Sequence, residues 1–159
     1  MTLLLLAGTG EARQIAAGLA ARAIPAVASL AGATREPKPL PISTRVGGFG
    51  GEEGFRAYLQ EAGITAILDA THPFAARITD RTARVARDLG LPYARLDRPE
   101  WQPGPGDLWT IIASEAEAAD HLSPDATVFL ATGRQTLERF ANLADRRVYC
   151  RQIDPPERE

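Results

Sequence analysis

The chain has 159 residues, of which 45% are hydrophobic and 24% are charged, and its formal net charge is −2. This composition predicts a soluble globular protein with a sizeable core, and the near-neutral charge gives no electrostatic reason to expect a nucleic acid or a membrane as partner. The single cysteine, Cys150, excludes an internal disulfide framework and favours the cytoplasm, while no stretch approaches the ~20 apolar residues of a membrane span.

The first predicted elements are a strand, "LLLLA" at 3–7, and a helix at 10–22, joined by a "GTG" turn. A strand, a glycine turn and a helix in this order are the context of a phosphate-binding loop, in which Gly8 permits the tight turn and Gly10 lets a pyrophosphate approach the helix N-terminus. The usual third glycine is replaced by Arg13. Because that glycine serves helix–strand packing, the replacement leaves the phosphate cradle intact and adds an arginine that could reach a phosphate. A plain tight turn is the alternative.

The second predicted strand, at 25–32, distinguishes between two nucleotides. Sites for NAD place Asp or Glu at the end of this strand to accept a hydrogen bond from the ribose 2′-hydroxyl. Here Ser29 or Leu30 takes that position, and Thr34 and Arg35 follow. Neutral and cationic groups suit a 2′-phosphate, so the sequence favours NADPH over NADH. The alternative is that Arg35 is only a solvated loop charge.

The next segment ends in the motif "LDATHPFAAR". It follows a short strand at 45–51 that breaks into glycines, a helix at 52–63 and a strand at 64–71, and it leads into a helix at 75–90. Asp69, Thr71 and His72 therefore lie at the carboxyl end of a strand, with Pro73 near the first helical position, where proline fits. A ligand-facing role for His72 competes with simple helix capping.

Three arginines follow on the helix at 75–90, spaced along one stripe. Arg77 lies in the first turn, closest to the predicted ligand edge, and is the candidate for binding a carboxylate. For Arg81 and Arg84 a solvated helix face is the expected setting.

The remaining chain continues the alternation of strands and helices. Strands are predicted at 91–97, 108–113, 126–133 and 146–153, with helices at 114–122 and 134–144. Arg98 and Trp101 follow the first of these strands, and Trp101 is either a flat wall for a planar ligand or a capping hydrophobe. A second anion-friendly turn contains Thr132, Gly133 and Arg134, the last available for a bidentate carboxylate contact.

Strands separated by helices predict a Rossmann-like α/β fold, with a parallel sheet covered by helices on both faces. In such sheets ligands bind at the carboxyl ends of the strands, where every distinctive motif of this chain falls. Two histidines and one cysteine, widely separated, form no metal-ligand pattern. A Tyr-x-x-x-Lys pair, a phosphate-binding G-x-x-x-x-G-K-[ST] loop and a G-x-S-x-G elbow do not occur.

Taken in order, "LAGTGEAR", "VGGFGG", "LDATHPFA", "RLDRPEW" and "FLATGRQTL" resemble the precorrin-6A (precorrin-6x) reductases of cobalamin biosynthesis, including the cobalt-precorrin-6A reductases. The resemblance implies NADPH-dependent reduction of a double bond in the precorrin-6A macrocycle to give precorrin-6B. It also implies two Rossmann-like halves with the tetrapyrrole between them. On this basis residues 1–143 are the NADPH-binding domain, and residues 144–159 lead into a second domain that is largely absent from this chain.

The resemblance also assigns roles to residues of this sequence. The cofactor loop would be formed by Gly8, Thr9, Gly10 and Arg13, and the adenosine phosphate would be bound by Ser29, Thr34 and Arg35. The nicotinamide or substrate side would be lined by Thr71, His72, Pro73 and Phe74, with His72 as a candidate catalytic group. Substrate contacts would come from Arg77, Arg98, Trp101, Thr132, Gly133 and Arg134.

Two alternatives from other functional classes stay open at this point. One is a non-catalytic NADP(H)-binding module, and the other is an NADPH reductase of a different small substrate. The oligomeric state is not predicted.

Overall fold

The computed structural model describes residues 1–32, 39–73, 75–99, 101–132 and 134–152. The chain divides into two compact units, Met1–Pro99 and Glu100–Glu159, each with its own sheet. The division differs from the boundary expected after residue 143, which falls inside the second unit, because the strands on either side of that boundary pair with each other. Among the described residues, every helix is too short or too polar to cross a bilayer.

Unit 1 contains a five-stranded sheet in the order β3-β2-β1-β4-β5, and every pair of neighbours is parallel. The strands are β1 (Thr2–Leu6), β2 (Ala26–Leu30), β3 (Ser43–Val46), β4 (Ile64–Asp69) and β5 (Tyr93–Arg95). Because all five run the same way, their carboxyl ends meet at one edge. The predicted Rossmann-like fold is confirmed. The third strand ends before the glycines because Gly47 has φ +113°, a conformation that favours glycine.

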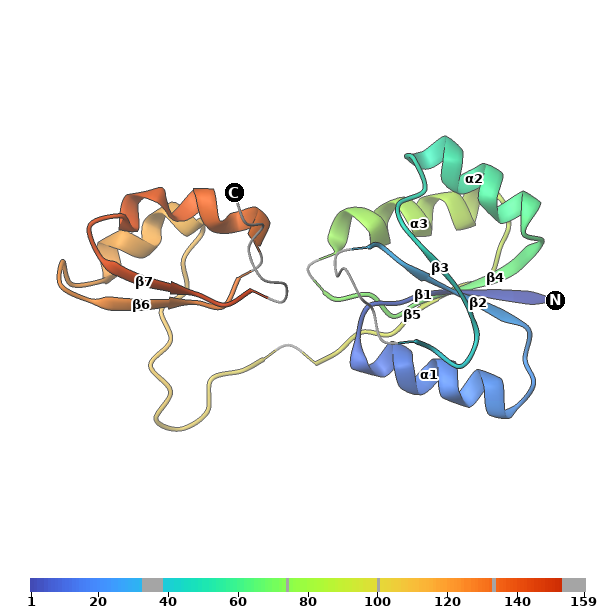
Figure 1. Cartoon of the computed structure of the whole chain (residues 1–159), viewed down its shortest axis with the longest axis horizontal. Coiled ribbons are helices and arrows are strands. Elements are labelled where there is room, and N and C mark those ends of the chain that lie inside the picture. The colour runs from blue at the N-terminus through green and yellow to red at the C-terminus, as the bar shows by residue number, and fades with distance from the viewer. Residues whose placement is uncertain (33–38, 74, 100, 133, 153–159) are drawn as a thin grey trace. The chain divides into compact units, whose positions relative to one another are not determined.

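Helices cover both faces of this sheet (Figure 1). Helix α1 (Gly10–Ala21) lies on one face, and α2 (Glu52–Glu61) and α3 (Ala76–Asp88) lie on the other. Successive strand residues point to opposite faces, so Leu5 packs with the α1 side while Leu4 and Leu6 pack with the α2 and α3 side. Both faces of β1 are therefore buried, as its unbroken run of leucines predicts.

Close packing of α1 against the sheet depends on Ala12 and Ala16, which are both buried. Arg13, at the position of the fingerprint's third glycine, is exposed. The small residues that let helix and strand approach thus stand one position before and three positions after it. This explains physically how the fold accepts an arginine at that point.

Unit 2 contains a parallel pair, β6 (Thr127–Leu130) and β7 (Arg147–Cys150), with the 3₁₀ helices η1 (Glu115–His121) and η2 (Arg134–Leu143) on one face (Figure 1). The helices predicted here are therefore present but of the tighter type, and η2 has a kink at Phe140. Leu130 and Leu143 are buried in this unit.

The strand predicted at 108–113 was wrong. In the described part of the chain these residues form no ladder, and Leu108 and Ile111 are 98% and 84% exposed. A strand is stable only when a neighbour pairs with its backbone, and the apolar pattern of "LWTIIA" carries no information about such a neighbour.

Candidate functional site

The turn between β1 and α1 is fixed by the hydroxyl of Thr9, the N-cap residue of the helix. Its Oγ1 accepts a hydrogen bond from the Ala12 amide at 3.1 Å and donates one to the Ala70 carbonyl at 2.8 Å, which ties the turn to the end of β4. Since that proton is already used, contacts to a phosphate would fall to the backbone N–H groups of the first helical turn, for which a helix offers no internal partner.

Gly8 and Gly10 are glycines for different reasons. Gly8 has φ +133°, which other residues rarely adopt. Gly10 has no such conformation, and a Cβ atom built on it would meet nothing within 4 Å. Nothing in the described structure therefore requires glycine at position 10, whereas the close approach of a ligand would. The turn fits a bound dinucleotide phosphate on this ground.

Two arginines predicted for the site are held near this turn by other parts of unit 1. Arg98 forms an ion pair with Glu11 in the first turn of α1. Backbone N–H groups at this helix start, followed by Arg98, lower the pKa of Glu11 below its usual value. Arg13 Nη1 donates to the Pro39 carbonyl at 3.2 Å, so its guanidinium lies against the connection between β2 and β3.

At the end of β2, Ser29 is buried and its hydroxyl oxygen accepts a hydrogen bond from Arg45 Nη1 at 2.8 Å. Arg45 is a site residue that the sequence analysis missed. The available signal was a lone cation at the end of a predicted strand, directly before the "GGFGG" glycines. Thr34 and Arg35 lie outside the described residues.

The end of β4 carries a buried polar network centred on Asp69, which is 1% exposed. Its carboxylate accepts hydrogen bonds from the Thr71 amide at 3.0 Å, the Thr71 hydroxyl at 2.7 Å, Thr79 Oγ1 at 2.9 Å and the Tyr93 hydroxyl at 3.1 Å. Burial, and then the charge of Asp69, raise the pKa of Tyr93 above its usual value. The network fixes the start of the 71–75 turn to α3 and β5.

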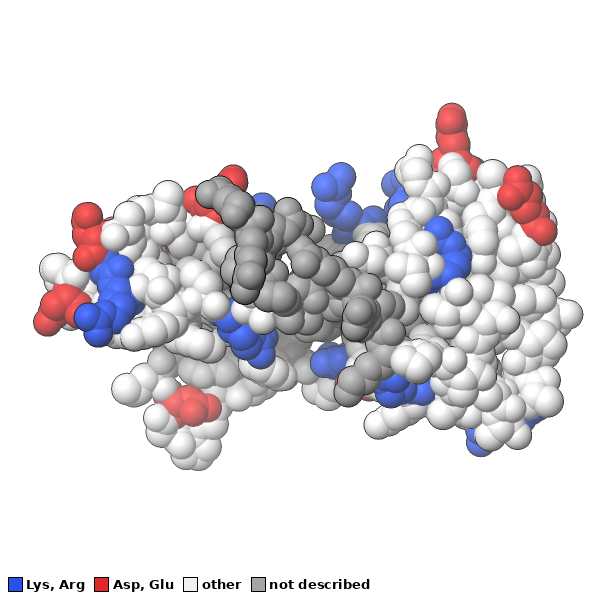
Figure 2. Space-filling model, in the orientation of Figure 1, with Lys and Arg blue, Asp and Glu red and all other residues white. Residues whose placement is uncertain are grey.

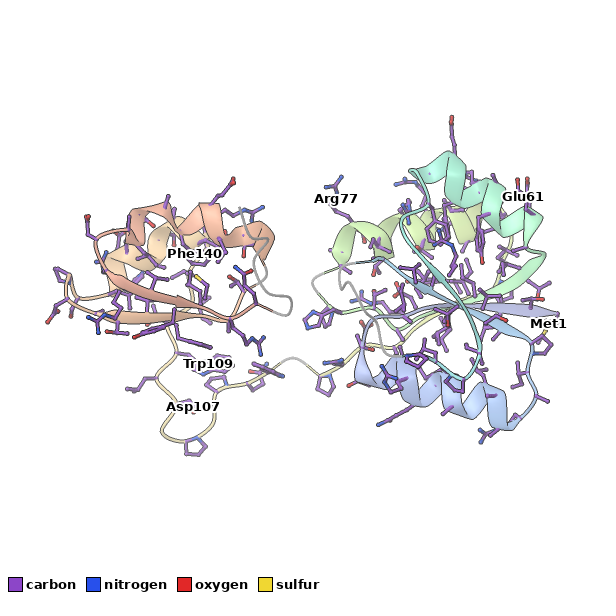
Figure 3. The ribbon with its side chains drawn as sticks, viewed as in Figure 1. Met1, Glu61, Arg77, Asp107, Trp109 and Phe140 are labelled. Carbon is purple, nitrogen blue, oxygen red and sulfur yellow. The ribbon has the colours of Figure 1, made fainter. Side chains whose placement is uncertain are left out.

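His72 and Pro73 are exposed on this turn, which closes with a hydrogen bond from the Ala75 amide to the His72 carbonyl at 2.8 Å. Phe74 lies outside the described residues. Arg77 is exposed at the start of α3 and extends away from the ribbon (Figure 3).

The solvated setting expected for Arg81 was wrong. Its guanidinium lies over Phe55 and Phe49, 5.0 and 5.7 Å from the ring centroids, and burial lowers its pKa. The stripe of arginines did not reveal this contact, because the aromatic rings come from a distant part of the sequence. Arg84 is 57% exposed and forms an ion pair with Glu52.

The remaining predicted residues belong to unit 2. Trp101 is 87% exposed and Thr132 is exposed after β6. Arg134 begins η2, and Gly133 lies outside the described residues. On the face shown in Figure 2, basic and acidic side chains of the described residues are interspersed, not gathered by sign.

Comparisons with known proteins agree with each other. The sequence model of the family "Precorrin-6x reductase CbiJ/CobK" matches residues 2–159. The precorrin-6A reductase of Rhodococcus erythropolis is 46% identical over 98% of this chain and 63% of its own length, and that of Sinorhizobium sp. is 44% identical over 96% and 59%. A solved structure titled "CobK precorrin-6A reductase" superposes with a TM-score of 0.93 at 38% identity, covering 100% of this chain and 64% of its own. The chain thus spans about three fifths of the length of these relatives.

Proposed function

Because this chain belongs to the precorrin-6x reductase family, we propose that it binds NADPH and takes part in the reduction of a double bond of precorrin-6A to give precorrin-6B. Bound NADPH supplies a hydride to one carbon of the double bond, and a proton added to the other carbon completes the reduction. The observation that carries the proposal is the β1–α1 turn, where the space in front of Gly10 is open and the first-turn amides face outward from a helix N-terminus.

The chain's own residues divide the task by position along the carboxyl edge. The first-turn amides of α1 hold the pyrophosphate, while Thr9 keeps the turn in place. The 71–75 turn, fixed through Thr71 by Asp69, lies against the nicotinamide, and His72 is the candidate proton donor. The adenosine 2′-phosphate falls to Ser29, Thr34 and Arg35. The substrate's carboxylates and planar ring fall to Arg77, Arg98, Trp101, Thr132, Gly133 and Arg134.

We also propose a cytoplasmic location. The single cysteine, Cys150, is free and exposed, an arrangement suited to a reducing compartment.

The proposal is tested by titrating the 159-residue chain with NADPH and following nucleotide fluorescence. Gly10→Ala places a methyl group where the pyrophosphate approaches and should weaken binding about tenfold or more, the equivalent of ~1.4 kcal/mol. The thermal midpoint should not fall, because that methyl group touches nothing in the protein. Gly18→Ala, the same substitution two turns later in the same helix, is the matched control and should bind NADPH normally.

If Gly10→Ala binds NADPH as tightly as the unaltered chain, the β1–α1 turn is not the phosphate site. If the unaltered chain binds neither NADPH nor NADH, the proposed function is wrong for this chain.

A further inference from the structure

Arg45 is held in one orientation at the carboxyl end of β3. It pairs in register with Ser29 on β2. Its Nη1 donates to the Ser29 hydroxyl at 2.8 Å and the Gly47 carbonyl at 2.9 Å, and its Nη2 donates to the Gly48 carbonyl at 3.0 Å. The guanidinium also lies 4.0 Å from the ring centroid of Phe49. This planar fork is therefore ordered by the fold alone.

The partners of Arg45 are all neutral: one hydroxyl, two carbonyls and aromatic rings. Other arginines of unit 1 are paired with carboxylates, as Arg84 is with Glu52 and Arg98 is with Glu11. The contacts of Arg45 thus hold its position without cancelling its positive charge. A cation fixed in this way raises the local affinity for anions.

The position of this charge matters because the end of β2 is where a Rossmann-like fold contacts the 2′-substituent of the adenosine ribose. A ribose hydroxyl needs an acceptor there, which is the role of the acidic residue in NAD sites. Ser29 instead has one lone pair engaged by Arg45 and retains its own proton as a donor. A donor beside a cation is complementary to a phosphate.

We infer that Arg45 is a specificity-determining residue that favours the 2′-phosphorylated nucleotide, both by its charge and by positioning Ser29. The inference rests on the proposed NADPH site and extends it to a residue outside the cofactor motifs of the sequence. It predicts that the preference for NADPH over NADH depends on Arg45, while the grip on the shared pyrophosphate does not.

Two independent substitutions test this, with dissociation constants measured for NADPH and NADH. Arg45→Met keeps an unbranched chain under Phe49 but removes the charge and the donors, and should weaken NADPH binding about tenfold or more while leaving NADH within about twofold. Ser29→Asp supplies the acceptor of an NAD site and neutralises Arg45, and should shift the preference toward NADH. Arg84→Met is the matched control on α3 and should change neither constant.

Adenosine 2′,5′-bisphosphate and AMP serve as competing probes that lack the nicotinamide half. The preference for the bisphosphate should disappear in Arg45→Met.

The inference is overturned if both substitutions change the two nucleotides equally or leave their ratio unchanged, as a purely structural role would. That result differs from failure of the proposed function, in which the unaltered chain itself binds no nucleotide.

Discussion

Gly54 shows how one missing side chain determines where the glycine-rich loop sits. A Cβ atom built on Gly54, in α2, would lie 1.8 Å from the Phe49 carbonyl oxygen, a distance no real contact reaches. The absence of that atom lets the loop before α2 approach the helix. Phe49 can then lie between the guanidiniums of Arg45 and Arg81 and the ring of Phe55, whose centroid is 4.7 Å away.

We therefore expect Gly54→Ala to lower the free energy of unfolding by about 1–3 kcal/mol, the usual cost of overpacking. Gly18→Ala should act in the opposite direction and stabilise the chain by about 0.5–1 kcal/mol, because alanine is the better helix former. At position 18 a new methyl group meets only the flexible end of Arg22 at 3.3 Å. Urea denaturation of both variants is the measurement, and equal effects at the two positions would contradict the packing argument.

At the residue scale, the sequence identified much of the candidate site and missed what depends on tertiary contacts. The glycines at 8 and 10, Thr9 and Ser29 were found because their roles follow from a strand–turn–helix context. Arg45 was missed because its importance arises from register pairing with Ser29, which the spacing of the residues does not reveal.

At the scale of elements, α2 and α3 are joined by a chain of charges on the outside of unit 1. Glu52 accepts from Arg84 and Arg56, and Arg56 also contacts Asp88. The hydrogen bonds from Arg84 and then Arg56 lower the pKa of Glu52 from its ordinary value of 4.5. A carboxylate whose pKa is lower in the folded state stabilises the fold above its unfolded pKa, and that contribution is lost as the pH falls.

Glu52→Gln should therefore flatten the acid side of the stability curve. We expect the unaltered chain to lose thermal stability progressively below about pH 4.5, with a smaller decline in the variant, measured by circular dichroism from pH 6 to pH 3. Glu53→Gln removes a neighbouring exposed carboxylate and is the control. A decline of equal steepness in the unaltered chain and Glu52→Gln would show that the charge chain contributes nothing.

Most elements of unit 1 could be predicted because each has a local signature: a buried apolar run, a capping residue or a terminal glycine. The strand expected at 108–113 could not be judged in the same way. Its apolar residues are typical of a strand, but a strand exists only when a neighbouring backbone completes the ladder. That requirement is a property of the assembled unit and leaves no trace in "LWTIIA".

At the scale of the whole molecule, the extended segment at 101–113 separates two regions of different construction. Unit 1 has five strands covered on two faces. The parallel pair in unit 2 has Phe129 and Tyr149 directly opposite each other, 65% and 55% exposed. A two-stranded sheet with an exposed aromatic pair buries less apolar surface, so we expect unit 2 to be the less stable region.

Limited digestion with chymotrypsin should make its first cuts at Trp101 and Leu108, since both are highly exposed and lie in no helix or strand. We expect a resistant fragment that contains residues 1–99, identified by mass spectrometry. First cuts at the aromatic residues of α2 would contradict this division of stability.

The hydroxyl of Thr9 has a consequence for how a long ligand would be received. By joining the amide of Ala12 to the carbonyl of Ala70, it makes the turn after β1 and the turn after β4 move as a single body. The span between these two turns is then set before any molecule arrives. A ligand that reaches from one turn to the other needs no binding energy to bring them together, and one of the wrong length cannot be accommodated by letting them slide apart.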